Sequence, residues 1–417
     1  MPDSDHNIGL RTAARLGLRT RKVLGLIGVY LAMYLLVDAG ALVHEYLLLP
    51  EGVSHVNPNV AEGAAWLAGR LELADRTYDT AQYEGRAYNV FPPLFSLISA
   101  AVLAFVPAGV PHVVLLVVAA LPIPGLAYGL FLRRTRRVRM AVLLTLGYLL
   151  GTSLLPVMDY ALRNGDVWHV NHLLSQVGLL IFLGDYFGRR RIWLGGLGLI
   201  LAIWSRQLMA WYLLPLALVA WRLRVSSSRR RAVWGFVIPA VVALVLPALL
   251  NTLKFDSPLA SGYRHIYEGR WDNLDDWPAQ SARRGIFSPV FLPRNLYFMN
   301  LGLPLPDLRG WALRFRPDVR GTGIWWTTPL LLLLVYDWHR VRRRREVRYL
   351  LTAVAGCWAV LMLYHSTGYA QLGYNRFSLD FMVVLLAVVA PRCDGPRRRW
   401  MALACVLWSI WYFRWAI

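Results

Sequence analysis

Residues 189–231 have the sequence RRRIWLGGLGLILAIWSRQLMAWYLLPLALVAWRLRVSSSRRR, in which about thirty apolar residues separate two arginine clusters. Only Ser205-Arg206-Gln207 interrupts the apolar run, Ile192–Trp221. As one helix the run would be roughly 45 Å long at about 1.5 Å per residue, and it would place the two clusters on opposite sides of a membrane. The segment therefore predicts two short spans that turn near Arg206, with both clusters on the same side.

The composition of the whole chain agrees with a membrane protein. Of its 417 residues 57% are hydrophobic, whereas soluble domains contain roughly 45–50% apolar residues. The excess excludes an ordinary soluble globule, a disordered chain and a collagen-like fibre. The net charge of +21 fits either a nucleic-acid binder or a membrane protein with arginines held in the cytoplasm. The arginine-rich loops are short and lack interleaved aromatic residues, so no nucleic-acid partner is expected.

Two kinds of loop alternate along the chain. Short arginine-rich loops hold 28 of the 45 basic residues, and longer loops are rich in aromatic residues, Asp and Asn. Requiring every arginine-rich loop to be cytoplasmic predicts eleven transmembrane helices, with the N-terminus inside and the C-terminus outside. The predicted spans are 23–43, 113–132, 140–157, 172–188, 192–205, 208–221, 232–250, 324–338, 349–364, 377–391 and 400–416.

The predicted fold is thus an all-α, multi-pass (polytopic) membrane protein with a single membrane domain, 1–417. The first apolar run is expected to be a retained anchor, and the first and third outer loops cover 44–112 and 251–323. Counting the apolar run Pro92–Val106 as a crossing would place the next arginine cluster outside, so it predicts a juxtamembrane or re-entrant helix on the outer side. The cytoplasmic (inner) membrane is the expected location, and the endoplasmic reticulum remains open.

The sequence lacks the common motifs of soluble enzymes. It contains no P-loop, no GxGxxG after a strand, no GxSxG and no HExxH, and its three cysteines form no CxxC pair. Asp272, Asp275 and Asp276 have oxygen ligands for a hard cation, but they lack the EF-hand glycine pattern. A solvated loop is therefore favoured for them, no metal ligand is predicted, and a need for a divalent cation is left open.

Several polar residues fall at or near membrane depth. Asp38 lies within the first span, where a carboxylate is costly and is either a functional residue or one paired locally. His169 and His172 are three residues apart, on one helical face, without further zinc ligands nearby, so either a satisfied polar site or a contact to a headgroup or substrate is expected. Arg376 and Asp380 fit either a structural ion pair or a cavity in which Arg376 binds phosphate.

Five segments in order resemble the GT-C glycosyltransferases, multi-span enzymes that use polyprenyl-phosphate sugars, such as the protein O-mannosyltransferases and aminoarabinose transferases. The resemblance covers about Val23 to Leu386. The segments are YDTAQYEGRAYNVFPPLFSL, LAIWSRQLMAWYLLPL, NTLKFDSPLASGY, GIWWTTPLLLLL and YAQLGYNRFSLDFMVVLL. In the third segment Asp256 stands where the family usually has Gly.

The resemblance implies a glycosyltransferase that moves a sugar from a polyprenyl-phosphate donor to a hydroxyl on a lipid, glycan or protein acceptor at the outer face. An acid removes the acceptor proton, and cations stabilise the departing phosphate. Many members of the family have an adjacent Asp-Glu pair in the first outer loop, where this chain has Asn57-Pro58-Asn59. Either the base lies elsewhere or the chain is an inactive relative.

The candidate site residues follow from that scheme. The candidate bases are Asp79, then Glu62, Glu45 and Asp38. The candidate ligands of the donor phosphate are Arg206 and Arg376, assisted by Lys254 or Arg264. The candidate substrate contacts are His169, His172, Tyr374 and Asp380.

Two other classes of function remain open. One is a transporter or flippase for a lipid-linked sugar, which predicts internal repeats that the sequence does not show. The other is a non-catalytic membrane assembly factor. All three classes have membrane lipids and a lipid-linked sugar as expected partners.

Overall fold

The computed structural model describes residues 57–76, 79–107, 115–116, 119–164, 167–188, 191–223, 229–266, 284–309, 312–316, 321–368 and 375–416. Within these ranges the chain is mostly helical, as the sequence predicts. The α-helices are α2 (Pro58–Leu67), α3 (Leu94–Phe105), α5 (Pro122–Thr135), α6 (Val138–Leu150), α7 (Leu154–Asn164), α8 (Val167–Tyr186), α9 (Ile192–Ile203), α10 (Leu213–Leu223), α11 (Arg229–Phe255), α13 (Leu292–Leu296), α14 (Ile324–Thr327), α15 (Leu332–Tyr336), α16 (Trp338–Val341), α17 (Arg345–Leu363), α18 (Met382–Val389) and α19 (Pro396–Trp411). Two antiparallel hairpins complete the fold: β1 (Thr80–Tyr83) with β2 (Arg86–Asn89), and β3 (Leu305–Arg309) with β4 (Ala312–Arg316).

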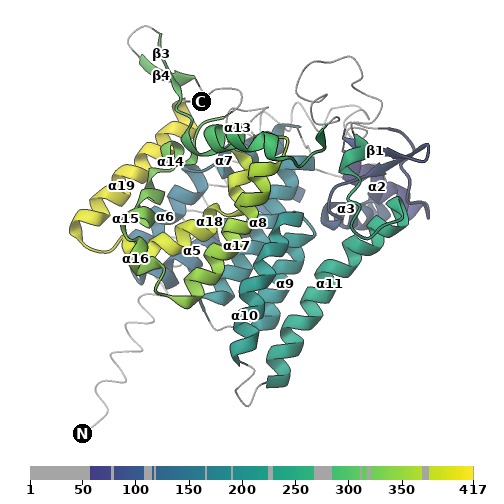
Figure 1. Ribbon diagram of the computed structural model, residues 1–417, viewed down its shortest axis with the longest axis horizontal. Coiled ribbons are helices and arrows are strands. Elements are labelled where there is room, and N and C mark those ends of the chain that lie inside the picture. Colours follow the sequence, from purple (N-terminus) through teal and green to yellow (C-terminus); the bar gives the residue numbers. More distant parts are fainter. Residues whose placement is uncertain are drawn as a thin grey trace.

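Most helices form one bundle around a shared apolar core (Figure 1). Helices α8 and α9 of this bundle pack closely, and they meet at Gly178 and Gly198. A Cβ atom on Gly178 would lie 2.4 Å from the carbonyl oxygen of Gly198 and 2.6 Å from the amide nitrogen of Ala202. The two backbones are therefore in direct contact, which is how small residues allow apolar helices to pack closely.

The long helix α11 runs along one side of the bundle (Figure 1). Its apolar side chains Trp234, Ile238 and Val245 are 58%, 56% and 54% exposed. Pro239 lies inside the helix and packs against α9, because a Cβ on Gly196 would come within 2.6 Å of its ring. An apolar helix that exposes this much of its surface is typical of a helix in contact with lipid.

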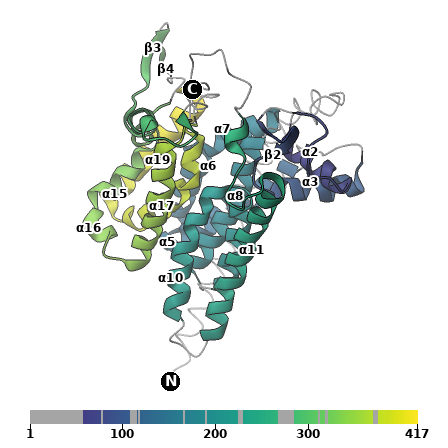
Figure 2. The ribbon, with the colours of Figure 1, turned by 45° about the vertical axis from the view of Figure 1, so that its right-hand side comes forward.

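A small outer unit, made of α2, β1, β2 and α3, lies beside the end of α11 (Figure 2). The sequence predicts a helix over Pro92–Val106, and the structure confirms it as α3, which packs on α2 at Gly63. A second apolar cluster joins the hairpin to the end of α11, with Tyr88 and Phe255 in edge-to-face contact at 5.6 Å between ring centroids. The hairpin is a feature that the sequence analysis did not predict.

The helical break near Arg206 is where the sequence predicts it. Helix α9 ends at Ile203, a 3₁₀ helix covers Gln207–Tyr212, and α10 continues from Leu213 in contact with α9. Arg206 itself is extended, with φ −147° and ψ 111°. The segment 192–221 is therefore two helices and not one.

The number of candidate membrane spans is lower than the sequence predicts. Among the described residues two helical segments are long and apolar enough to cross a membrane, Val233–Phe255 and Arg345–Leu363. A third candidate is α6 with the first part of α7, a pair bent by 49°. The sequence predicts eleven spans. Part of the difference arises because the predicted span 23–43 lies outside the described residues. Another part arises because helices are broken where apolar runs are continuous: 324–338, for example, is divided into α14, a 3₁₀ turn and α15.

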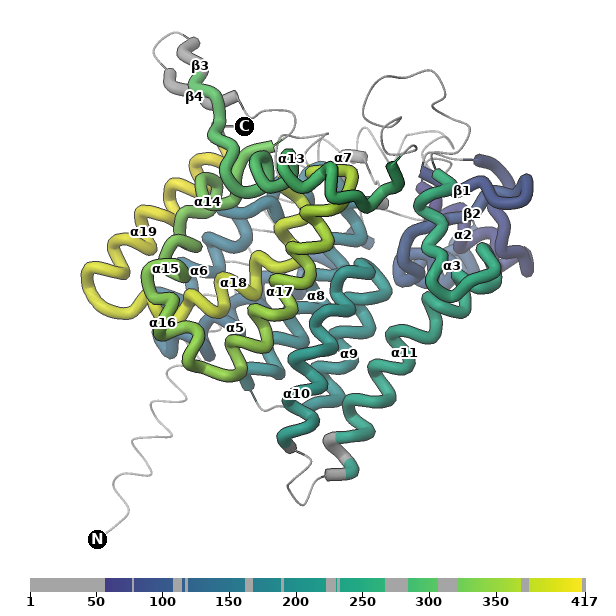
Figure 3. Tube along the Cα trace, in the orientation of Figure 1, coloured from purple at the N-terminus to yellow at the C-terminus, as the bar shows by residue number. Residues whose placement is uncertain are grey.

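Among the described residues, the arginine-rich segments 133–139, 340–348 and 392–399 lie at the end of the bundle opposite the outer unit (Figure 3). Helix α17 connects the two ends, from Arg345 to Leu363. Exposed tryptophans flank the arginine clusters in the sequence. They are Trp193 (57% exposed), Trp221 (59%), Trp234 (58%), Trp338 (49%) and Trp400 (72%).

The contact between α8 and α9 yields a stability prediction. Gly178→Ala forces the two backbones apart, so we expect the free energy of unfolding to fall by about 1–3 kcal/mol. Gly129→Ala, on α5, is the matched control because a Cβ there meets nothing within 4 Å, and alanine favours a helix by roughly 1 kcal/mol over glycine. Thermal unfolding of the purified protein in detergent measures both. Equal melting temperatures for the two variants would contradict the close contact.

Candidate functional site

The candidate site is a cavity of about 120 Å³ at the end of the bundle that faces the outer unit. Residues from the outer unit, α8, the break after α9, the segments after α11 and before α13, the end of α17 and the 3₁₀ helix Arg376–Asp380 line it. They are Phe91, Pro92, Trp168, Asn171, Ser205, Arg206, Gln207, Leu208, Ser261, Tyr263, Ile286, Phe287, Val360, Leu361, Tyr364 and Phe377. The wall is mainly aromatic and aliphatic, and Arg206 is its charged residue.

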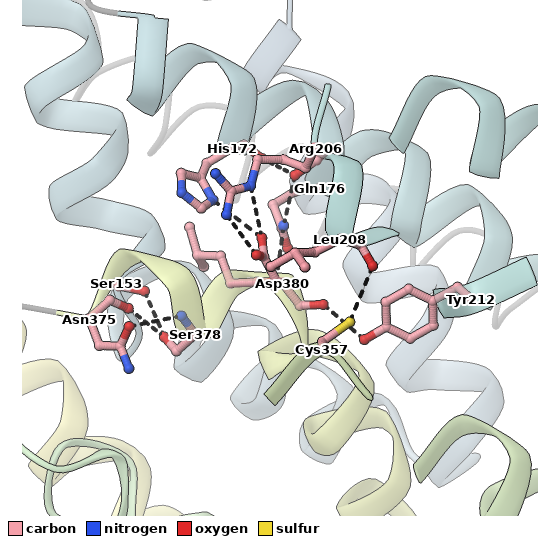
Figure 4. A network of polar contacts seen from close by, with 12 residues as sticks. Ser153, His172, Gln176, Arg206, Leu208, Tyr212, Cys357, Asn375, Ser378 and Asp380 are labelled. Carbon is pink, nitrogen blue, oxygen red and sulfur yellow. Dashed lines mark hydrogen bonds and ion pairs between the residues drawn. The ribbon is translucent and has the colours of Figure 1, made fainter. Parts of the chain in front are cut away.

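A bidentate ion pair lies directly behind this wall (Figure 4). Arg206 donates from Nε to Oδ1 of Asp380 at 3.2 Å and from Nη2 to Oδ2 at 2.7 Å. The Asp380 side chain is fully buried and the Arg206 side chain is 19% exposed. Within the described part of the chain Nη1 of Arg206 makes no hydrogen bond, so this nitrogen remains available to an acceptor in the cavity.

The segment around Asp380 is held by contacts from three other segments (Figure 4). Tyr212 donates its hydroxyl to the carbonyl oxygen of Asp380 at 2.8 Å, and Gln176 donates to the carbonyl of Leu379 at 3.1 Å. Ser153 and Ser378 form a hydroxyl contact at 3.1 Å. The 3₁₀ helix Arg376–Asp380 is thus fixed in place before α18 begins.

His172 completes this group. Its Nδ1 lies 3.6 Å from Oδ1 of Asp380, and its ring centroid lies 6.2 Å from that of Phe377. The side chain is buried, and neither ring nitrogen has a hydrogen-bond partner among the described residues. The candidate substrate contacts His172 and Asp380 and the candidate phosphate ligand Arg206 are therefore neighbours.

Phe377 brings the two candidate phosphate-binding arginines to the cavity. The guanidinium carbon of Arg206 lies 5.4 Å from its ring centroid, and that of Arg376 lies 5.3 Å away. Arg376 also lies 5.6 Å from the ring of Trp168, another residue of the wall. All three distances between guanidinium carbon and ring centroid are within the range of cation–π contacts. Two arginines from separate segments therefore flank one aromatic residue of the wall.

Tyr263 connects the cavity with Asp79. Burial raises the pKa of the Tyr263 hydroxyl to about 12; Arg206 and Arg376 oppose this rise, and the charge of Asp79 adds to it. Tyr263 is therefore within electrostatic reach of a carboxylate on one side and of two guanidinium groups on the other. Asp79 has a left-handed backbone with φ +58°, which is uncommon for a residue other than glycine although Asp tolerates it.

Glu62 and Lys254 are brought together, but away from the cavity wall. Lys254 Nζ contacts Oε1 of Glu62 and donates to the carbonyl oxygen of Asn89 at 3.1 Å. The other carboxylate oxygen accepts from Nδ2 of Asn89 at 2.7 Å and from the hydroxyl of Ser96. Both side chains are buried. The structure thus places the sequence-predicted base Glu62 in an ion pair that joins the outer unit to α11.

The other predicted site residues lie apart from the cavity wall or outside the described residues. His169 is buried, with its ring 4.4 Å from that of Tyr160. Arg264 is exposed and donates to His265 at 3.3 Å. Asp38, Glu45 and Tyr374 lie outside the described residues, as does the acidic group 272–276. Among the described residues no three His, Cys, Asp or Glu side chains lie close enough to hold a metal ion.

The sequence analysis did not single out the aromatic residues of the wall. Tyr263 and Phe377 fall within segments that carry the family resemblance, yet the chain has 20 Tyr and 15 Phe, and nothing local distinguishes these two. Their position beside Arg206 depends on contacts between distant segments. Tyr83, which is not part of the wall, also depends on a contact between distant segments. Its hydroxyl donates a hydrogen bond to Asp256, 173 residues away, and this bond raises the pKa of the Tyr83 hydroxyl.

The chain was compared with protein families, with curated proteins and with solved structures, and none of them matches it.

The ion pair of Glu62 and Lys254 yields the second prediction. Lys254→Met leaves a buried carboxylate without its cation, so we expect a loss of about 3–5 kcal/mol in stability. In the double variant Lys254→Met/Glu62→Leu no charge stays buried, and we expect it to recover part of the loss. Thermal unfolding in detergent measures all three proteins. A double variant that is no more stable than Lys254→Met would contradict this account of the pair.

Proposed function

We propose that the protein is an integral-membrane glycosyltransferase, which transfers a sugar from a polyprenyl-phosphate donor to an acceptor hydroxyl at the cavity. The observation that supports this most directly is the position of two guanidinium groups at the wall, since those of Arg206 and Arg376 lie 5.4 and 5.3 Å from the ring centroid of Phe377. Glycosyl transfer to a hydroxyl needs a base near the acceptor and cations near the leaving phosphate.

In this proposal Asp79 is the base. It is half-buried, and its charge acts on Tyr263. Glu62 is less suited to the role because it is buried and bonded to Lys254, Asn89 and Ser96.

Arg206 and Arg376 bind the donor phosphate in this proposal. Arg206 is bonded to Asp380 through Nε and Nη2, so it contributes directed N–H donors from Nη1 to a phosphate oxygen. The aromatic wall formed by Trp168, Tyr263 and Phe377 provides surfaces against which a sugar ring or an isoprenoid segment can pack. His172 and Asp380 hold Arg206 in position from behind the wall.

We also propose a GT-C-like topology with eleven crossings, in which several crossings are bent or broken helices. Two observations support it. Apolar side chains of α11 are exposed along the helix, and the exposed tryptophans lie next to arginine clusters, as in the aromatic belt of a membrane interface. Broken helices are tolerated at membrane depth where they line a cavity, as the segment around Arg206 does.

The topology predicts that the two ends of the bundle lie on opposite sides of the membrane. Arg343→Cys, at the arginine-rich end, and Arg86→Cys, in the outer unit, both replace exposed arginines. In a background without Cys357, Cys393 and Cys405, a membrane-impermeant maleimide added to intact cells should label only Arg86→Cys. Permeabilised membranes serve as the control and should allow labelling of both. Labelling of both positions in intact cells would refute the proposed orientation.

The catalytic proposal predicts that Asp79→Asn removes transfer. Loss of the base should lower the rate by about 10²–10⁴-fold, and asparagine tolerates the left-handed backbone that Asp79 adopts. The matched control is Glu84→Gln, since Glu84 is an exposed acid of the same loop with φ +50°. The assay uses the protein in nanodiscs with a panel of radiolabelled polyprenyl-phosphate sugars and a membrane-lipid acceptor extract.

Arg376→Ala in the same assay separates donor binding from proton transfer. We expect a weaker apparent affinity for the donor, because a phosphate contact is lost, together with a reduced rate. Transfer that is unchanged in Asp79→Asn would exclude Asp79 as the base. Saturable binding of a lipid-linked sugar without transfer from any donor would favour the transporter or the assembly factor instead.

A further inference from the structure

The arginine-rich end of the bundle carries a large excess of positive charge. Its segments 133–139, 337–348 and 392–399 contain fifteen arginines and three acidic residues. Asp337 is bonded to Arg398 at 2.7 and 3.2 Å and lies 3.7 Å from Arg340. The few carboxylates present therefore neutralise only a small part of this charge.

A second cavity, of about 190 Å³, opens at this end, between the start of α6 and the loop before α19. Arg134, Arg136, Arg137 and Asp394 contribute to its lining. Helices α6 and α19 both begin here, and neither has a side chain that caps its first amide groups. Uncapped helix N-termini favour an anion because their N–H groups and dipoles point toward it.

Asp394, an acidic residue of the lining, shows how the basic groups of this cavity bind a carboxylate. Its Oδ1 accepts hydrogen bonds from Arg399 Nη2 at 3.0 Å and from the amide of Gly395 at 2.9 Å, and it forms an ion pair with Arg137 Nε at 3.0 Å. The hydrogen bond from Arg399, the amide of Gly395 and the charge of Arg137 hold the pKa of Asp394 below its usual value. Two hydrogen bonds and one ion pair, from two segments, thus converge on a single carboxylate oxygen.

Other arginines of the lining have donors to spare. Within the described part of the chain Arg134 makes one hydrogen bond, from Nε to the carbonyl of Ala387 at 2.8 Å, and its guanidinium stacks 3.9 Å above the ring of Phe187. Burial and the neighbouring charges of Arg344 and Arg392 lower the pKa of Arg134 to about 10. An added anion would relieve the repulsion between these charges.

We propose that this cavity binds the phosphate group of an anionic membrane lipid, with Arg134, Arg136 and Arg137 as its ligands. The lipid is preferred to free phosphate because exposed Trp338 and Trp400 flank the same end, and such residues mark the depth of the lipid headgroups. Basic pockets between helices at this depth bind anionic headgroups. The site lies at the opposite end from the candidate catalytic cavity and does not depend on the proposed transfer reaction.

The test uses the full-length protein, purified and delipidated in a neutral detergent. Microscale thermophoresis measures binding of dioctanoyl phosphatidylglycerol, dioctanoyl phosphatidylcholine and inorganic phosphate. We expect saturable binding of phosphatidylglycerol, weakened roughly tenfold or more in Arg136→Gln/Arg137→Gln, since each arginine near a headgroup contributes about 1 kcal/mol. The matched control, Arg342→Gln/Arg343→Gln, removes the same charge from exposed positions that do not line the cavity and should bind like wild type.

A second variant tests the site in the opposite direction, and it stays informative if the double variant does not fold. Asp394→Asn releases Arg137 and Arg399 from their internal carboxylate, so phosphatidylglycerol should bind severalfold more tightly. Equal weakening in the site variant and the control would show a general charge effect and overturn the proposal. Equal affinity for phosphatidylcholine would also overturn it. Inorganic phosphate that binds as tightly as phosphatidylglycerol would replace the lipid by a free anion as the ligand.

Discussion

The buried ion pair between Arg206 and Asp380 is the interaction on which the arrangement of the site depends. Burying either charge alone is costly, and removing one partner of such a pair typically destabilises a protein by about 3–5 kcal/mol. The two side chains meet only because the chain leaves helical geometry twice, once between α9 and the 3₁₀ helix Gln207–Tyr212, and once at the 3₁₀ helix Arg376–Asp380. Tyr212, Gln176 and Ser153 then stabilise the second break through hydrogen bonds. The breaks are therefore part of how the pair is accommodated.

The same breaks explain why apolar runs do not become full-length helices. Helix α9 has 12 residues and α18 has 8, whereas a straight crossing needs about 20. Irregular backbone inside a bilayer must be satisfied by protein or by water in a cavity. Here the hydrogen bonds around Asp380 satisfy one break, and the other lines the cavity. The two helix breaks thus explain both the short helices and the cavity with its charged and aromatic wall.

The features that could be predicted from sequence are those with a local cause. The break near Arg206 follows from three polar residues within an apolar run, and the helix α3 follows from the apolar segment after Pro93. The sequence places Arg206 and Asp380 at or near membrane depth, but no local pattern indicates that these two residues pair across 174 residues. The sequence also gives Glu62 and Lys254 separate roles, because no local pattern indicates their contact across 192 residues. The aromatic wall could not be predicted, because only the fold brings Tyr263 and Phe377 next to the charged residues of the site.

The arginines at the two ends of the bundle differ in how far they are paired with carboxylates, and this difference suits the two ends to different anions. Helix α17 joins them with 19 residues, a length of roughly 28 Å at about 1.5 Å per residue, which is close to the hydrocarbon thickness of about 30 Å. At the cavity end Arg206 is already paired with Asp380, so it attracts an anion mainly through directed N–H groups. In the proposed function, recognition at this end depends on the position of the acceptor oxygens, as selection of one donor requires. At the opposite end the arginines outnumber the carboxylates, and the proposed lipid site uses those arginines that line the second cavity. In these two proposals the arginine-rich end binds an anionic headgroup, and the cavity end binds the donor phosphate.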